Sequence, residues 1–167
     1  MPFPTLVTFG PNGFEAYARL RYIPDPQRPG QKETDVDLPD DHPSDSEQAA
    51  RVLDVLAGFT TTPQECFFAA WEGYPDLSLP RGVPLFEVPN RRFALLRGPL
   101  NATRAFFADK QPPAYVWPAD RRWCFTSDVD PHWAGIGAPG AAIDALTVAP
   151  TFDVVPADPA GAQPFYY

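Results

Sequence analysis

Cysteine and histidine are scarce in this sequence, and each scarcity narrows the chemistry that the chain supports. The two cysteines, Cys66 and Cys124, stand alone in aromatic runs and have no CxxC spacing. They predict neither a zinc site nor a thioredoxin-like centre, so we expect two reduced thiols in the core. The two histidines, His42 and His132, leave few bases for nucleophilic catalysis, and no G-x-S-x-G motif accompanies them.

Positive charge is also sparse, with 13 lysines and arginines against 21 acidic residues and a net charge of −8. The closest basic neighbours are the pairs Arg19/Arg21, Arg91/Arg92 and Arg121/Arg122. Nucleic-acid binding needs several such side chains presented together, so we expect no nucleic-acid partner. The chain has no apolar run long enough for a membrane span and no signal-peptide pattern at its N-terminus. We therefore expect a cytoplasmic protein without membrane contact.

Proline, in contrast, is abundant, with 23 prolines among 167 residues. Proline removes a backbone donor and disfavours helix in the preceding residue, so long helices are excluded. The length suits one domain, and the hydrophobic content of 44% suffices for a core. We expect a single α+β domain over residues 1–167, with a mainly antiparallel sheet of five to seven strands and two or three short helices on one face.

Residues 24–45 are the most polar part of the chain. They contain five prolines, seven acidic side chains, two basic side chains and almost nothing apolar. Such a segment buries too little apolar surface to offset the entropy lost on ordering. It is predicted to form a mobile acidic loop on the surface.

The pattern before this loop predicts a β-hairpin. Residues 5–9 and 14–23 flank the sequence Gly10-Pro11-Asn12-Gly13, and Asn-Gly between two such runs favours a hairpin turn. Apolar and polar side chains alternate through 14–23, as they do in a half-buried strand. A helix is the alternative there, because alanine and arginine favour it.

Further elements follow from local signals. Ser44-Asp45-Ser46-Glu47 is a capping box before apolar residues at helical spacing, and Gly58 follows as a stop. Shorter helices are predicted for 100–108 and 140–146. Strands are predicted for 66–71, 83–88, 92–96 and 122–129, with an edge strand at 152–155. The run 66–71 is apolar throughout, so we expect it in the centre of the sheet, covered on both faces.

Several segments resemble, in the same order, a family of uncharacterised actinobacterial proteins. They are FEAYAR (14–19), TTPQECF (61–67), WEG (71–73), LRGPL (96–100), WPADRRWC (117–124) and TSDVD (126–130). This chain has Gly137-Ala138-Pro139 where members have a Gly-Gly-Ser-like turn. The resemblance implies no activity. The layout is also similar to bacterial immunity-type domains with mixed sheets, which implies a protein-neutralising role.

Asp128, Asp130 and His132 form a weak candidate metal site. Two aspartates in alternation on a strand point to one face, and carboxylates with an imidazole suit a divalent ion. A structural turn that ends the strand is the interpretation we favour, and a polar contact to a ligand is the third alternative. We therefore expect no metal and no other cofactor.

The sequence from Gly135 to Gly140 matches the GxGxxG pattern of dinucleotide-binding proteins. That function needs a following strand with an acidic residue about 20 positions further on. Only 27 residues remain after Gly140, and they are rich in proline. We interpret the pattern as a glycine-rich turn that leads into a short helix.

Glu72 is the carboxylate that the sequence places nearest to apolar surroundings, beside Trp71 at the end of the apolar run. Such surroundings raise the pKa of a general acid. Together with Asp128, Asp130 and His132 it would form the cleft of a small enzyme, such as a metal-dependent hydrolase or transferase. The simpler alternative for Glu72 is a salt bridge or a cap at the strand end.

Aromatic side chains are the most suggestive feature of the chain. Three tryptophans and three charged residues are the candidate binding residues: Trp117, Asp120, Arg121, Trp123, Asp128 and Trp133. Tryptophan and arginine are enriched where partners bind, although core packing is the alternative for the tryptophans. Our leading hypothesis is a non-enzymatic binding or regulatory module that uses this segment and the acidic loop, with an unidentified partner for which a protein is one candidate. The small enzyme is the alternative hypothesis.

Overall fold

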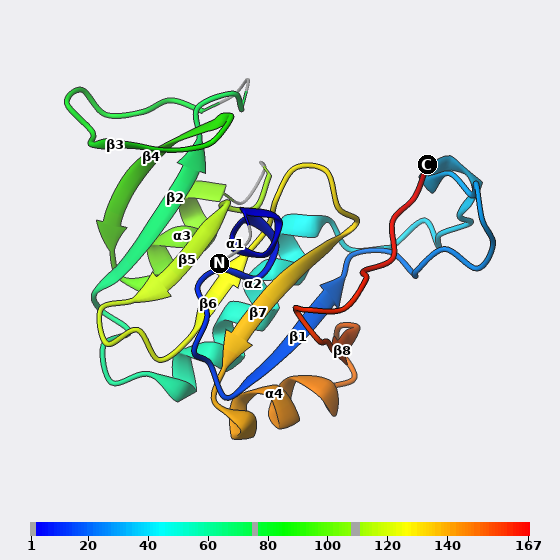
Figure 1. Cartoon of the computed structure of the whole chain (residues 1–167). Helices are drawn as coiled ribbons and strands as arrows, with labels where there is room; N and C mark the ends of the chain where they lie inside the picture. Colours follow the sequence, from blue (N-terminus) through cyan, green and yellow to red (C-terminus); the bar gives the residue numbers. More distant parts are fainter. Residues whose placement is uncertain (1–2, 75–76, 108–110) are drawn as a thin grey trace.

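A computed structural model of the chain describes residues 3–74, 77–107 and 111–167. It contains one antiparallel sheet of eight strands with helices on both of its faces (Figure 1). The predicted α+β class and antiparallel sheet are confirmed. The predicted number of five to seven strands was too low, because two strands lie in segments where no strand was expected.

Four α-helices and two 3-10 helices lie within the described residues. The helices are α1 (Phe3–Phe9), α2 (Asp45–Leu56), α3 (Leu100–Phe107) and α4 (Gly140–Thr147), with η1 (Glu33–Asp35) and η2 (Ala57–Phe59). The strands are β1 (Ala16–Arg21), β2 (Cys66–Trp71), β3 (Leu85–Val88), β4 (Arg91–Gly98), β5 (Tyr115–Pro118), β6 (Cys124–Thr126), β7 (Trp133–Ala138) and β8 (Val154–Pro156). The predicted helix 100–108 corresponds to α3, and residue 108 lies outside the described residues.

The strands follow the order β3-β4-β2-β5-β6-β7-β1-β8. The apolar run that forms β2 lies between β4 and β5, as its composition predicts. The strand predicted near 152–155 is β8, and it forms one edge of the sheet. These positions follow from composition, because an inner strand needs apolar side chains on both faces and an edge strand tolerates proline.

Three helices, α2, α3 and α4, cover one face of the sheet and bury most of the core. Their buried apolar residues are Ala49, Val52, Leu53, Leu56, Leu100, Phe107, Ala142, Ile143 and Leu146. The predicted capping box starts α2: the Ser44 hydroxyl accepts from the Glu47 N–H, and the Glu47 carboxylate accepts from the Ser44 N–H. The α2 helix then passes into η2, so Gly58 lies within a 3-10 turn rather than at a helix stop.

The predicted hairpin at 5–23 was wrong in its first half, because residues 3–9 form helix α1 on the opposite face of the sheet (Figure 1). Both edges of β1 are occupied, one by β7 and the other by β8, so no edge is free for a hairpin partner. Gly10, at φ 74°, ends the helix in the left-handed conformation. The helix lies over β6 and β7, where a Cβ atom on Gly135 would lie 1.9 Å from the Thr8 carbonyl oxygen.

The glycine-rich segment at 135–140 also differs from expectation. Gly135 and Gly137 are residues of strand β7, and Pro139 alone separates that strand from α4, which begins at Gly140. Strand β5 was not predicted, and β6 is limited to three residues of the expected 122–129. Glycine in a strand often marks a place where another part of the chain packs closely on the backbone. Here α1 packs on Gly135 and the ring of Phe14 packs on Gly137.

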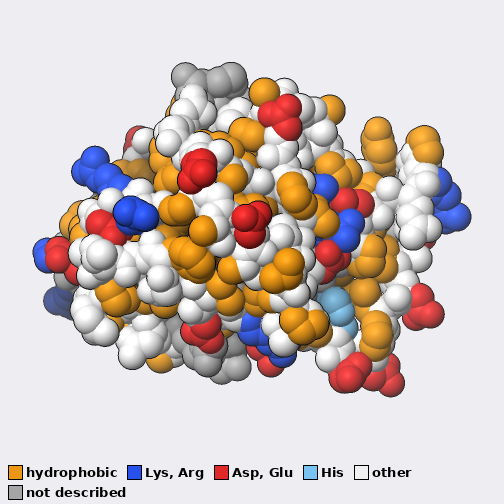
Figure 2. Space-filling model, turned by 90° about the horizontal axis from the view of Figure 1, so that it is seen from below, with side chains coloured by type: hydrophobic (Ala, Val, Ile, Leu, Met, Phe, Trp, Pro, Cys, Tyr) orange, Lys and Arg blue, Asp and Glu red, His pale blue; other side chains and the backbone are white. Residues whose placement is uncertain are grey.

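The acidic segment 24–45 leaves the sheet after β1 and projects from one end of the molecule beside the C-terminal residues (Figure 1). Figure 2 shows acidic and basic side chains at the outer edge of this projection. The backbone N–H of Tyr167 donates to the Gln31 carbonyl oxygen at 3.0 Å, and His42 Nε2 lies 2.7 Å from the Tyr22 carbonyl oxygen. The segment is thus hydrogen-bonded to the rest of the chain near its middle and near its C-terminal end, and its mobility stays a prediction.

Among the residues described, no helix has both the length and the apolar character needed to cross a membrane.

Candidate functional site

The face of the sheet opposite α2, α3 and α4 is only partly covered by α1, and a groove of about 880 Å³ lies beside that helix. Its floor comes from neighbouring strands, where Tyr115 and Trp117 of β5 lie beside Cys124 of β6. Side chains two positions apart on a strand point to the same face, so β5 presents both rings to the groove.

The β3–β4 hairpin forms one wall of the groove. Phe86 and Val88 line it, whereas Leu85 and Glu87 point to the other side of the strand and are exposed. The ring of Phe86 packs on that of Phe93 at a centroid distance of 5.3 Å, which fixes the hairpin over the sheet. The hairpin turn contains Asn90 at φ 65°, a conformation that asparagine tolerates better than most residues.

The other wall is formed by α1 and the turn that follows it. Leu6 and Phe14 line the groove, and the Tyr115 hydroxyl donates to the Leu6 carbonyl oxygen at 3.2 Å. A Cβ atom on Gly137 would lie 2.3 Å from the Phe14 ring, so the absence of a side chain there allows Phe14 to lie against the sheet. Burial raises the pKa of Tyr115 far above its ordinary value, so the hydroxyl stays a donor.

Trp117 is held in place by a neighbouring ring. It stacks on Phe67 of β2 at a centroid distance of 5.5 Å and an interplanar angle of 18°. The guanidinium of Arg97, on the neighbouring strand β4, lies 5.9 Å from the centre of the Phe67 ring. Trp117 is half-buried, so part of its indole remains available to a ligand.

Charged side chains gather at one edge of the groove, in the turn between β5 and β6. Arg121 and Arg122 are exposed there, and Glu15 also lines the groove. The carboxylate of Asp120 accepts hydrogen bonds from the N–H and the hydroxyl of Thr61, and from the Thr60 hydroxyl at 2.7 Å. Burial works to raise the pKa of Asp120, but these hydrogen bonds prevail and lower it.

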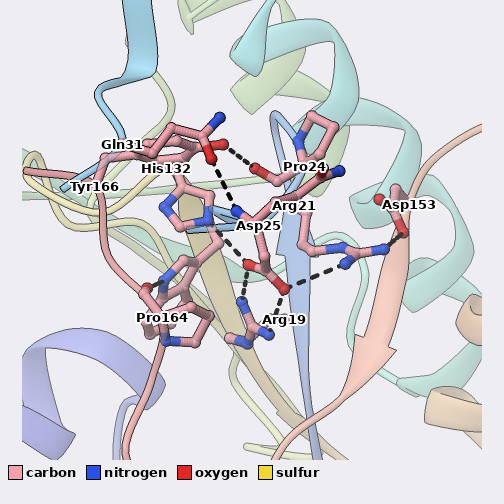
Figure 3. Close-up of polar contacts among 11 residues, drawn as sticks. Arg19, Arg21, Pro24, Asp25, Gln31, His132, Asp153, Pro164 and Tyr166 are labelled. Carbon is pink, nitrogen blue, oxygen red and sulfur yellow. Dashed lines mark hydrogen bonds and ion pairs between the residues drawn. The ribbon is translucent and has the colours of Figure 1, made fainter. Parts of the chain in front are cut away.

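A second polar cluster lies at the far end of β1, around the carboxylate of Asp25 (Figure 3). Arg19 donates to its two oxygens at 2.7 and 3.0 Å, Arg21 donates at 3.2 Å, and His132 Nε2 lies 2.9 Å away. Burial works to raise the pKa of Asp25, but the contacts with Arg19, His132 and Arg21 outweigh it and hold the pKa well below its usual range. Arg21 also donates to Asp153 at 2.8 Å.

His132 therefore belongs to the contact that anchors the acidic segment and the C-terminus. Its ring packs edge-on against Tyr166 at 4.7 Å, and the Tyr166 hydroxyl donates to the Pro24 carbonyl oxygen (Figure 3). Beside it, Trp133 Nε1 donates to the Pro164 carbonyl oxygen at 3.2 Å. The role of this cluster is to join three distant parts of the chain.

The other candidate catalytic or metal-binding groups are paired with arginines near the β3–β4 turn. Arg91 donates to Asp128 at 3.2 Å and to Asp130 at 3.0 Å, and Arg92 donates to Glu72 at 2.6 Å. His132 pairs instead with Asp25. Over residues 3–74, 77–107 and 111–167 no group of three or more histidine, cysteine, aspartate or glutamate side chains is placed to hold a metal ion.

The three tryptophans of the candidate binding segment have different surroundings. Trp123 and Trp133 are 0% and 1% exposed, so the core-packing alternative describes them. Trp117 lines the groove with a half-buried ring, Arg121 lies at the edge, and the fully buried Trp123 also borders the groove. Asp120 and Asp128 are engaged in the contacts described above. Strand pairing brings Phe14, Phe86, Val88 and Tyr115 to the same groove, and no local sequence signal links these four residues.

A search against models of protein families, curated proteins and solved structures finds no match for this chain.

Proposed function

We propose that this chain is a non-enzymatic binding protein whose ligand site is the groove on the open face of the sheet. The occupant is a small molecule with a flat apolar body. The observation that carries the proposal is the convergence of Phe14, Phe86, Tyr115 and Trp117 on one concavity of about 880 Å³. Ligand pockets in proteins have volumes of about 300–1,000 Å³ and mainly apolar or aromatic linings.

The groove is supported on all sides by contacts that exist without a ligand. Tyr115 ties α1 to the sheet, Phe93 holds Phe86, and Phe67 holds the Trp117 ring. A site that is already formed binds without the entropy cost of ordering its side chains. This arrangement favours recognition of a rigid, flat molecule.

The charged residues give less support to the enzyme hypothesis. That hypothesis needs Glu72, Asp128, Asp130 and His132 at one point, whereas Asp128 and Asp130 pair with Arg91, Glu72 pairs with Arg92, and His132 pairs with Asp25. The oxygens of the three carboxylates accept hydrogen bonds from arginine, which leaves them less available to a substrate or a metal ion. The paired state of these groups therefore favours binding over catalysis.

A protein-neutralising role of the immunity type stays a prediction from sequence layout. Its proposed contact surface included Trp123 and Trp133, and their burial removes two large side chains from any exposed patch. The remaining ring, that of Trp117, lines the groove. Recognition of a small molecule in the groove is therefore the better-supported form of the binding hypothesis.

The experiment is a titration with 2-naphthylacetamide, a neutral molecule with a flat apolar body, followed by ¹H–¹⁵N NMR. We expect shift changes confined to residues that line the groove, including the Trp117 indole N–H. Val88→Asp places a charge in the apolar wall and should weaken binding about tenfold or more.

Leu85→Asp is the matched control, because Leu85 is in the same strand but is 50% exposed on the other side. It should bind the probe as the wild type does. Absence of shift changes at millimolar probe, or equal losses in both variants, would contradict the proposed function.

A further inference from the structure

We infer that the natural ligand of the groove carries a carboxylate on its flat apolar body, and that Arg121 and Arg122 hold this carboxylate. The inference rests on the proposed function and adds the chemical class of the ligand. It comes from two observations on the turn between β5 and β6 and one on Glu15, each independent of the groove's volume.

The first observation is that these arginines have no carboxylate partner in an acidic protein. Among the described residues, six other arginines form ion pairs: Arg19, Arg21, Arg28, Arg91, Arg92 and Arg97. Neither Arg121 nor Arg122 forms an ion pair with any residue that the structure describes. With 21 acidic residues against 13 basic ones, two adjacent guanidinium groups at the edge of an apolar groove are left available for an external anion.

The second observation is the backbone conformation of Arg121. Its φ of 55° lies in the left-handed region, which costs a residue with a Cβ atom about 1 kcal/mol and which glycine adopts freely. The turn is held by the hydrogen bond from the Arg121 N–H to the Pro118 carbonyl oxygen at 2.9 Å and by that from the Arg122 N–H to Asp120 at 3.2 Å. Strain of this kind is found where the side chain has a role in a site.

The third observation concerns Glu15, the one carboxylate among the residues that line the groove. Its Oε2 accepts a hydrogen bond from the Gly140 N–H at 3.0 Å, at the start of α4. Its charge is therefore partly offset by the helix N-terminus. The groove is therefore lined by two positive charges without an ion-pair partner among the described residues, those of Arg121 and Arg122. Its negative charge, that of Glu15, is hydrogen-bonded to the start of α4, so the lining favours an anion.

Carboxylate is the headgroup that this arrangement fits best. Guanidinium groups are planar and donate two parallel hydrogen bonds, so they match the two oxygens of a carboxylate. The apolar floor formed by Tyr115 and Trp117 would hold the body of the same molecule. An aromatic or similarly flat carboxylic acid satisfies both halves of the site.

The test compares 2-naphthylacetate with its neutral isostere 2-naphthylacetamide by isothermal titration calorimetry. We expect the acid to bind about tenfold more tightly than the amide at low salt, with this preference shrinking as salt screens the guanidinium charges. The double variant Arg121→Gly/Arg122→Gln should lose the preference. Lys32→Gln, which removes a charge from the acidic segment, should keep it, and its net charge differs from the wild type by only one.

Arg121→Gly also separates binding from stability. Glycine relieves the strain at φ 55°, so the melting temperature should stay equal or rise while affinity for the acid falls. If the role of Arg121 were purely structural, the variant would have a lower melting temperature and an unchanged affinity for the acid. Arg122→Gln alone, at a position without positive φ, provides a second variant in case the turn rearranges.

The outcomes distinguish the two proposals. Equal affinities for acid and amide, both lost in Val88→Asp, would leave the proposed function standing and overturn the carboxylate inference. A preference for the acid that survives in the double arginine variant would also overturn it. Binding of neither probe would refute the proposed function and the inference together.

Discussion

The guanidinium of Arg19 and the carboxylate of Asp25 face each other in a two-pronged contact, with N–O distances of 2.7 and 3.0 Å. Arg19 is only 7% exposed, and its guanidinium also lies 5.5 Å from the centre of the Trp133 ring. A charge in this position is tolerated because Asp25 compensates it. The acidic segment is thereby held to the sheet at its first carboxylate.

Asp25→Asn should therefore destabilise the protein by about 3 kcal/mol, because it leaves the buried charge of Arg19 without a counter-charge. Urea unfolding measures this difference. Asp153→Asn is the matched control: Asp153 is more exposed, at 46% of its side chain, and pairs only with Arg21. Its loss should cost about 1 kcal/mol or less. Equal effects of the two substitutions would contradict the role assigned to Asp25.

The same contact predicts how stability depends on pH. The pKa of Asp25 in the folded chain lies below its ordinary value of 3.8, so its ionised form stabilises the fold. That contribution is present above about pH 4 and is lost as the pH falls through the lowered folded pKa. The difference in stability between wild type and Asp25→Asn should narrow as the pH falls from about 5 toward 2. A stability difference that widens as the pH falls would contradict the lowered pKa of Asp25.

Gly135→Ala tests the docking of α1. The added Cβ atom would lie 1.9 Å from the Thr8 carbonyl oxygen, which is backbone and cannot rotate away. We expect a loss of about 3 kcal/mol and faster hydrogen exchange in α1, because the helix must move off the sheet. Gly58→Ala is the control: nothing lies within 4 Å of its added Cβ atom, so stability should change by less than about 1 kcal/mol. Wild-type stability in Gly135→Ala would exclude the tight contact between α1 and β7.

The two thiols should react slowly in the folded protein. Burial raises the pKa of Cys66 to about 11, with Asp120 adding to the effect, and burial raises that of Cys124 to about 12. At pH 8 the thiolate fraction is then lower than that of an ordinary cysteine by about a hundredfold or more, and so is the rate with DTNB. Unfolding in urea should restore full reactivity. Rapid labelling of the native protein at either cysteine would contradict the buried, protonated state.

Local sequence signals were sufficient to predict an element where the residues that stabilise it are close together in the sequence. Ser44 and Glu47 satisfy each other's backbone groups within four residues, so the start of α2 can be predicted from the sequence. The apolar run 66–71 can only be covered on both faces in the middle of a sheet, and it lies there. The alternation through β1 likewise separates Ala18 and Leu20 in the core from Arg19 and Arg21 on the other face.

Residues 5–9 and 135–137 show where such signals mislead. Thr5 to Phe9 have strand-forming side chains, but the edges of β1 are taken by β7 and β8, and the chain forms a helix instead. Gly135 and Gly137 have the composition of a turn, yet they lie in a strand because α1 and Phe14 pack directly on them. The deciding neighbours are more than 100 residues away along the chain.

Composition and local spacing thus account for the fold class, the main helix and the central strand. The groove and the ion pairs depend on the tertiary structure. Trp117, Phe86 and Phe14 line one groove only after strands β3 and β5 and the turn that follows α1 have assembled. For the same reason, the partners of Asp128 and His132 could not be foreseen: Arg91 and Asp25 lie 37 and 107 residues away in sequence. Side-chain contacts between distant segments depend on strand order, and no local pattern specifies that order.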